Sequence, residues 1–277
     1  MMKKIVFLSI LICLLTSFSK KEITWVAIGD SITYLNNHPE ATENRITKGY
    51  MSMLVDKHPD IHYINQGYSG WTSGGIAEHF DSLGIIKADL YTVFLGTNDW
   101  FQGRPLGTLT DYTNNTGNNT VYGSFRIIVN KIRNLNASAP IIFITPMQRT
   151  DFVYQFDMKN NAFGCYRKQK DQSLSQFADA VMAICRQEHF ACVDLYNKKE
   201  LSIEHLVKFK RVKDPQTGKY RDYPYPDYIG IPFDPAKDEY PYPVAAVDMT
   251  YDGLHPSDKG FAVIASMLEE KMKVYNN

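Results

Sequence analysis

Ile23-Thr24-Trp25-Val26-Ala27-Ile28-Gly29-Asp30-Ser31-Ile32-Thr33 is the stretch that decides the predicted fold. Its apolar, β-branched first half is typical of a buried strand, and the run stops abruptly at Gly29. Glycine permits a sharp turn, and Asp30 and Ser31 are both good helix N-caps. A serine between a strand and a helix is well placed for a nucleophile, although an ordinary capped turn has the same pattern. Residues elsewhere in the chain are therefore needed to distinguish a nucleophilic serine from an ordinary capped turn.

Strands and helices continue to alternate beyond this stretch. Apolar runs predict four further strands, and amphipathic spacing predicts five helices. The strands are expected at 61–65, 89–95, 140–146 and 190–195, and the helices at 46–58, 76–83, 122–135, 169–189 and 258–275. Residues 108–120 and 147–166 are expected to be loops. Such alternation favours an α/β fold with a parallel sheet covered by helices on both faces.

The N-terminus has the pattern of a secretory signal peptide. Lys3 and Lys4 precede an apolar run over 5–15, and Ser17-Phe18-Ser19 places small residues at the −3 and −1 positions of a cleavage site. The run is too short to span a membrane comfortably. We therefore expect residues 1–19 to be removed on export to the periplasm or the medium, and residues 20–277 to form one domain with no membrane span.

Cys13 raises lipoprotein anchoring as an alternative fate of the N-terminus. Ile12 is bulky where a lipoprotein signal needs a small residue, which argues against an anchor. Cys165, Cys185 and Cys192 form an odd set without paired spacing, so they do not indicate a disulfide framework, although one bridge stays open.

Composition limits the class of protein. The chain has 277 residues, 44% of them hydrophobic, which is enough for an ordinary globular core. Lysine plus arginine equals aspartate plus glutamate at 30 each, so no basic excess indicates a nucleic-acid partner.

Residues 208–244 are rich in tyrosine and proline. Proline at this density excludes a regular helix, so we expect an ordered, extended excursion from the domain and not a second domain.

Several polar groups follow the predicted strands or lie in late loops that can reach the same sheet edge, where open parallel sheets bind ligands. Acyl transfer needs a nucleophile, a base, a group that orients the base and donors for the oxyanion. Ser31 can attack, His255 can act as base and Asp252 can orient it. The amides of Ser31 and Gly70 and the side chain of Asn98 can form the oxyanion hole.

Each of these features alone also has a structural reading. Asp252 can belong to a turn, Asn98 can cap a helix, and Gly70 can serve backbone geometry only. Asp252 and His255 can also be a metal pair, but no further cluster of ligating residues completes such a site. Their joint occurrence favours catalysis without a metal or cofactor.

The chain resembles the SGNH hydrolase superfamily, the GDSL-type lipases and esterases. Four blocks carry the resemblance: Gly29-Asp30-Ser31, Asn65 through Gly70, Gly96-Thr97-Asn98-Asp99 and Asp252-Gly253-Leu254-His255. The resemblance implies a three-layer α/β/α sandwich on a five-stranded parallel sheet. It also implies Ser31, His255 and Asp252 as a catalytic triad, with Ser31, Gly70 and Asn98 as the oxyanion hole. Ile32 replaces the leucine of the GDSL motif, and the excursion lies outside the family pattern.

The expected activity is ester hydrolysis, most specifically the removal of acetyl or other short acyl groups from carbohydrates. Abundant aromatic residues and polar loops near the site suggest a small-molecule or glycan ester. Candidate substrate contacts are Trp71, Asp99, Trp100, Arg149 and Asp151. Two alternatives stay open: a lipase or lysophospholipase, and a non-catalytic glycan-binding protein on the same fold. The sequence does not indicate an oligomeric state.

Overall fold

The computed structural model describes residues 21–273. The expected signal peptide, with Cys13, lies outside these residues, as does the end of the last expected helix. In the described part, five parallel strands form one sheet in the order β2-β1-β3-β4-β7. These strands are β1 (Ile23–Gly29), β2 (Ile61–Gly67), β3 (Leu90–Phe94), β4 (Ile141–Ile144) and β7 (Ala191–Val193). The predicted five-stranded parallel sheet is confirmed.

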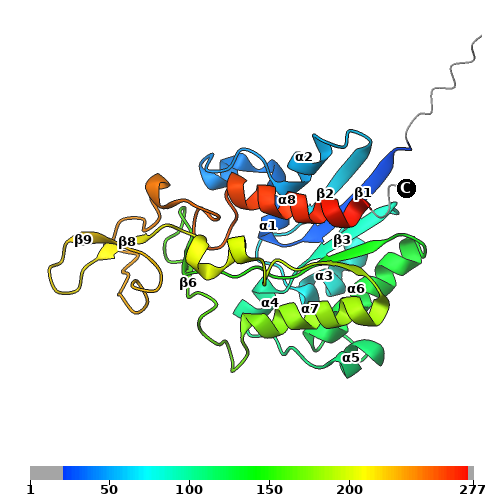
Figure 1. Ribbon diagram of the computed structural model, residues 1–277. Coiled ribbons are helices and arrows are strands. Elements are labelled where there is room, and N and C mark those ends of the chain that lie inside the picture. The colour runs from blue at the N-terminus through cyan, green and yellow to red at the C-terminus, as the bar shows by residue number, and fades with distance from the viewer. Residues whose placement is uncertain (1–20, 274–277) are drawn as a thin grey trace, which may run out of the picture.

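Helices cover both faces of this sheet (Figure 1). One face carries α1 (Ser31–Tyr34), α2 (Tyr50–Val55) and α8 (Asp258–Met272). The other carries α3 (Ser73–His79), α4 (Thr97–Phe101), α5 (Leu109–Thr113), α6 (Val121–Leu135) and α7 (Leu174–Glu188). The three-layer α/β/α architecture is therefore also confirmed.

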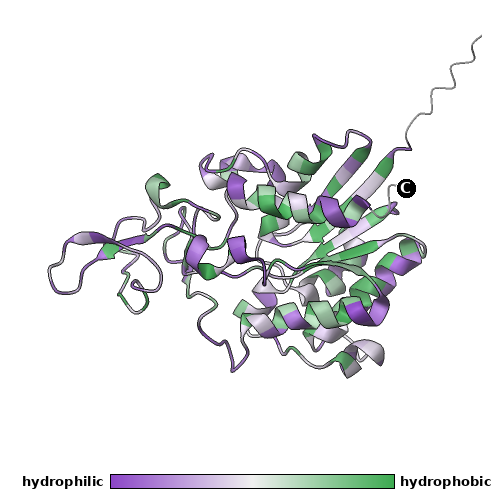
Figure 2. Cartoon of the chain, in the orientation of Figure 1, coloured by the Kyte–Doolittle hydropathy of each residue, from purple (hydrophilic) through white to green (hydrophobic). Residues whose placement is uncertain are grey.

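The strands alternate their side chains between two hydrophobic cores, as a period of two requires. In β1, Val26 and Ile28 pack with α3, α6 and α7, whereas Trp25 and Ala27 pack with α2 and α8. All four side chains are fully buried, and Figure 2 shows the sheet as largely hydrophobic. Because both faces of the sheet are buried, the strand sequences are continuous apolar runs and do not alternate between apolar and polar residues.

Two helices are shorter than the sequence pattern predicts. Helix α2 begins after Gly49 because the Asp258 carboxylate accepts hydrogen bonds from the Thr47 N–H and hydroxyl at 2.7 and 2.6 Å. Helix α7 begins at Leu174 because the backbones of Gln169 and Gln172 pair with each other. Between them, Lys170 and Asp171 have φ values of 47° and 61°, which no right-handed helix contains.

The two predicted loops and the excursion hold short elements that periodicity does not reveal. Residues 108–120 contain α5, which starts with a Thr108–Asp111 capping box. Residues 147–166 contain a hairpin of β5 (Phe152–Val153) and β6 (Asn161–Ala162). The excursion contains a second hairpin, β8 (Lys210–Lys213) with β9 (Tyr220–Tyr223), which projects from the body in Figure 1.

No helix within residues 21–273 is long and apolar enough to cross a membrane.

Candidate active site

Ser31 lies at the carboxyl end of the central region of the sheet. Strand β1 ends at Gly29, Asp30 caps the short helix α1 by accepting the Ile32 N–H at 3.0 Å, and Ser31 is the first helical residue. A Cβ at position 29 would lie 2.1 Å from the Thr33 hydroxyl, so this turn requires glycine. The turn places the Ser31 side chain at a cavity of about 850 Å³.

His255 and Asp252 approach Ser31 from the loop before α8. The Ser31 hydroxyl lies 2.8 Å from His255 Nε2, and His255 Nδ1 lies 2.7 Å from Asp252 Oδ2. Asp252 Oδ1 accepts the backbone N–H groups of Leu254 and His255 at 3.0 and 2.7 Å. An ionised carboxylate only accepts hydrogen bonds, so Nδ1 carries a proton and Nε2 is free to accept the serine proton.

Gly253 is necessary for the shape of this loop. Its φ is +89°, and a Cβ there would lie 2.1 Å from the Asp151 carbonyl oxygen. The Gly253 carbonyl also accepts the Thr150 N–H at 2.9 Å, which ties the loop to the segment after β4. This hydrogen bond fixes the two segments to each other. The position of His255 therefore depends on a contact between residues far apart in the sequence.

Gly70 and Asn98 reach the same cavity from two neighbouring loops. Gly70 has a φ of +78°, and within the described residues its N–H has no acceptor. Asn98 Nδ2 donates one hydrogen to the Trp71 carbonyl at 3.0 Å, which leaves its second hydrogen for another acceptor. Two groups named from the sequence as oxyanion donors thus line one cavity with Ser31.

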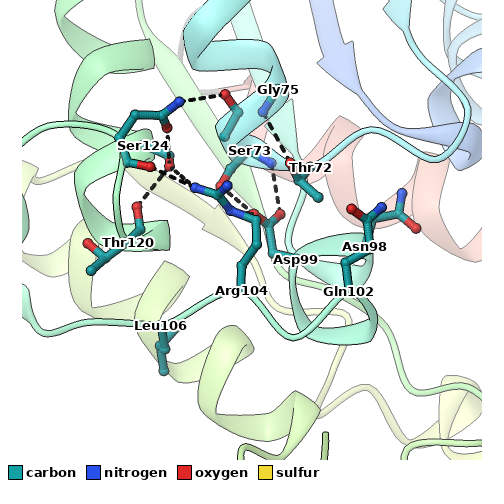
Figure 3. Close-up of polar contacts among 12 residues, drawn as sticks. Thr72, Ser73, Gly75, Asn98, Asp99, Gln102, Arg104, Leu106, Thr120 and Ser124 are labelled. Atoms are coloured by element: carbon teal, nitrogen blue, oxygen red, sulfur yellow. Dashed lines mark hydrogen bonds and ion pairs between the residues drawn. The ribbon is translucent and has the colours of Figure 1, made fainter. Parts of the chain in front are cut away.

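Asp99, a predicted substrate contact, does not line the cavity and is fully buried in a polar network (Figure 3). Its carboxylate accepts the Ser73 N–H at 2.8 Å and the Ser73 hydroxyl at 2.7 Å, and Arg104 Nε lies 3.3 Å away. Arg104 in turn donates to the Ser124 hydroxyl at 3.1 Å. The network fixes the start of α3, just after the Gly70 loop, against α4 and α6.

Trp100 is likewise misassigned by the sequence, because its side chain is fully buried. Its indole N–H donates to the Gln172 carbonyl at 3.0 Å, so it anchors the segment before α7. The next residue, Phe101, lines the cavity instead. Trp71 lines the cavity as expected, packed at 5.0 Å between ring centroids against Tyr68.

Two aromatic residues beside His255 were not among the sequence candidates. Tyr251 stacks on the imidazole at 5.9 Å between centroids, and Phe152 meets it edge-on at 5.5 Å. Both line the cavity. Tyr251 directly precedes Asp252 in the last sequence block, and this adjacency was the one available signal.

Arg149 lines the cavity, as predicted, although only 2% of its surface is exposed. Its Nε and Nη2 atoms are buried without a hydrogen-bond partner, and its guanidinium carbon lies 5.1 Å from the Phe101 ring centroid and 5.8 Å from that of Phe152. Burial lowers the pKa of Arg149 to about 10, so it stays charged at neutral pH. An unpaired buried donor costs about 1–3 kcal/mol, and more when charged.

Asp151 is not available for a substrate, contrary to expectation. Its carboxylate accepts the Gly164 N–H at 3.0 Å, the Tyr166 hydroxyl at 2.6 Å and the Lys210 ammonium at 2.9 Å. The Lys210 side chain, from β8 in the excursion, is 5% exposed. Asp151 therefore joins the excursion to the segment after β4.

The buried tyrosines of the excursion pack against the segment that follows β4. Tyr228 and Tyr242 are fully buried and do not line the cavity. The Tyr228 hydroxyl hydrogen-bonds to the Thr150 hydroxyl, and the Tyr242 hydroxyl donates to the Asp151 carbonyl. Both contacts reach residues adjoining Arg149. The excursion therefore packs under the segment that carries Arg149.

The cysteines and the ligating residues of the described part form neither a bridge nor a metal cluster. Cys165, Cys185 and Cys192 are all free thiols. Within residues 21–273, no group of three or more His, Cys, Asp or Glu side chains is arranged to hold a metal ion. Asp252 and His255 face each other and Ser31.

Asp30 gives the fold a specific pH dependence. Burial raises the pKa of Asp30 from 3.8 to about 6. Between these values the folded state binds more protons than the unfolded state, so stability falls as pH rises, and the loss is complete above about pH 6. Asp30→Asn removes the charge and keeps an oxygen for the Ile32 N–H. We expect it to raise the free energy of unfolding at pH 8 by up to about 3 kcal/mol, with no gain below pH 4.

Urea unfolding of both proteins at several pH values measures this effect. Asp179→Asn, at an exposed position of α7, is the matched control. An equal gain at pH 4 and pH 8 would show that ionisation of Asp30 is not the cause.

Comparison with known proteins agrees with this architecture. Residues 27–263 match the model of the GDSL-like lipase/acylhydrolase family. A crystal structure described as a possible lipase from Chitinophaga pinensis is 60% identical, covers 92% of this chain and 99% of its own, and superposes with a TM-score of 0.91.

More distant structures share the fold alone. An acetyl xylan esterase is 15% identical with a TM-score of 0.54, over 90% of this chain and 98% of its own. A lipase/acylhydrolase from Enterococcus faecalis is 16% identical with a TM-score of 0.51, over 91% and 96%. No curated protein matches the chain. On the family match and the 60% identical structure, the chain belongs to the GDSL-like lipase/acylhydrolase family.

Proposed function

We propose that the protein is a serine hydrolase of carboxylic esters, with Ser31 as nucleophile, His255 as general base and Asp252 as the group that orients His255. The hydrogen-bonded chain from Ser31 through His255 to Asp252, ending at an open cavity, carries this proposal. Asp252 holds the imidazole so that Nε2 faces the hydroxyl. Serine is a weak nucleophile until such a base accepts its proton.

The reaction follows from these positions. The Ser31 oxygen attacks the ester carbonyl as its proton moves to His255 Nε2. The tetrahedral intermediate collapses with loss of the alcohol, which takes the proton from His255, and leaves an acyl-serine. Water then attacks the acyl group as one of its protons moves to His255. His255 returns this proton to the Ser31 oxygen as the carboxylic acid leaves, which restores Ser31.

The proposed oxyanion hole consists of the Ser31 and Gly70 N–H groups and the Asn98 side-chain amide. All three residues line the cavity, and the second hydrogen of Asn98 Nδ2 is available for the developing charge. Removing one such donor from an acyl-transfer site typically costs about 10²–10³ in kcat. The Asp99–Ser73 contacts position this hole through α3 and α4 without entering it.

For the substrate, we propose short acyl esters of carbohydrates, with acetyl as the first choice. The cavity of about 850 Å³ is lined by several aromatic residues that can stack on a sugar ring, among them Trp71, Tyr34 and Tyr154. Export by the predicted signal peptide is part of this proposal, since glycans of that kind are met outside the cell. The apolar wall formed by Leu35, Phe101 and Leu254 is the observation that favours the second candidate, a lipase or lysophospholipase.

A panel of esters separates these candidates. We expect acetylated oligosaccharides and 4-nitrophenyl acetate to be hydrolysed faster than 4-nitrophenyl esters of eight or more carbons, by at least about 10-fold in kcat/KM. The reason is that each acyl methylene that the site does not fit costs about 1–3 kcal/mol. A rise of kcat/KM with chain length would contradict the carbohydrate proposal and favour the lipase. Glycan binding without turnover of any ester would favour a non-catalytic glycan-binding protein.

A further inference from the structure

Arg149 stands out among the cavity residues because its charge has no hydrogen-bond partner. Nε and Nη2 are buried and unpaired, and Nη1 makes no hydrogen bond to any described residue. The guanidinium is enclosed by the rings of Trp100, Phe101 and Phe152, with its carbon 5.1–5.8 Å from their centroids. The three rings contact the guanidinium, and no residue within 21–273 accepts a hydrogen bond from it.

Asp252 and Asp151, the two carboxylates that act electrostatically on Arg149, do not accept a hydrogen bond from it. Asp252 directs both oxygens at Leu254 and His255, and Asp151 directs its oxygens at Gly164, Tyr166 and Lys210. These carboxylates balance the charge of Arg149 at a distance without bonding to it. Arg149 therefore stays ionised without a bound anion, and it is free to bind an anionic ligand.

The site around Arg149 suits a carboxylate better than a phosphate. Arg149 is the single permanently charged side chain among the described residues that line the cavity. One guanidinium matches one carboxylate in charge, whereas a dianionic phosphate would be left with excess charge among aromatic walls.

We propose that Arg149 binds a carboxylate of the substrate, so that the enzyme prefers esters bearing a carboxylate over neutral esters of the same size. This inference rests on the proposed ester hydrolysis at Ser31. Phe152 contacts both Arg149 and His255, so the bound carboxylate lies one aromatic ring away from the reacting centre. The carboxylate can belong to the acyl part or to the alcohol part of the ester, for instance to an acidic sugar.

Matched ester pairs test the preference in the unchanged protein. On the acyl side, 4-nitrophenyl monosuccinate is compared with 4-nitrophenyl 4-oxopentanoate. On the alcohol side, 4-acetoxybenzoate is compared with 4-acetoxybenzamide. We expect the charged member of one pair to have the higher kcat/KM by about 10–100-fold, the range for a hydrogen bond to a charged group, and the pair that responds identifies which part carries the carboxylate.

Variants assign this preference to Arg149. Arg149→Gln and Arg149→Met should lower kcat/KM for the charged ester about 10–100-fold more than for its neutral partner, and Arg149→Lys should retain part of the preference. Arg167→Gln, at an exposed arginine outside the cavity, is the control. An equal loss for charged and neutral esters would mean that Arg149 is structural and would overturn the proposal.

Binding measurements keep the result independent of turnover and of variant folding. Calorimetric titration of the unchanged protein should show benzoate binding more tightly than benzamide, and phenyl phosphate no more tightly than benzoate. Equal binding of benzoate and benzamide, or tighter phenyl phosphate, overturns the carboxylate proposal. Neutral esters hydrolysed without any charged preference would refute this inference alone, whereas absence of all ester hydrolysis would refute the proposed function.

Discussion

Replacing Ser31 by alanine is expected to lower kcat for 4-nitrophenyl acetate by about 10⁴–10⁶-fold, the range found when a serine nucleophile is removed from a triad. The loss follows from geometry, because the Ser31 hydroxyl is the group that lies 2.8 Å from His255 Nε2. The oxyanion donors and the cavity stay in place, so the KM for the ester should change little. Initial rates with purified protein measure the effect.

Ser69→Ala is the matched control for this prediction. Ser69 is an exposed serine that lines the same cavity and has no base beside it. Its replacement should leave kcat within about 3-fold, since alanine keeps the backbone and removes only an exposed hydroxyl. Covalent labelling by a fluorophosphonate should occur in the unchanged protein and in Ser69→Ala, and should be absent in Ser31→Ala. Labelling that persists in Ser31→Ala would place the nucleophile elsewhere.

Asp252→Asn is expected to lower kcat by about 10⁴-fold, as when the orienting aspartate of a triad becomes an amide. The amide oxygen can still accept the Leu254 and His255 N–H groups, so the loop should keep its shape. Its NH₂ group would then face His255 Nδ1, which must accept a hydrogen bond and carry its proton on Nε2. In that tautomer His255 cannot accept the serine proton.

Thermal unfolding should show that Asp252→Asn is folded, which separates a tautomer effect from a loss of structure. Asp248→Asn, in the same loop but ion-paired with Lys259, serves as the control and should retain activity. Comparable losses in both variants would indicate that the loop and not the His255 tautomer had been disturbed.

The strand and helix pattern could be predicted because it depends on local spacing. The apolar run 23–28 and its four counterparts report burial on two faces, and parallel strands place their carboxyl ends at one edge. This is why Ser31, Gly70, Asn98 and His255, spread over more than two hundred residues, could be assigned to one site from the sequence.

The substrate contacts were predicted less well because they depend on orientation within short elements. In α4, a five-residue helix, neighbouring side chains point about 100° apart, so Trp100 enters the core while Phe101 lines the cavity. The Asp99 carboxylate accepts a hydrogen bond from Ser73, and the Asp151 carboxylate accepts one from Lys210 of the excursion. No local period encodes which of several polar residues will find a partner so far along the chain.

The sequence by itself determined the sheet, its order of layers in outline and the residues proposed to carry the chemistry, because hydrophobic periodicity and turn residues act over a few positions. Only the tertiary structure decided that Asp99, Trp100 and Asp151 are internal supports and that Arg149 is left as an unpaired cation facing the cavity. The physical reason is that hydrogen-bond satisfaction is a property of the whole fold. A charged side chain becomes a binding group when the packed chain has used every other acceptor within reach.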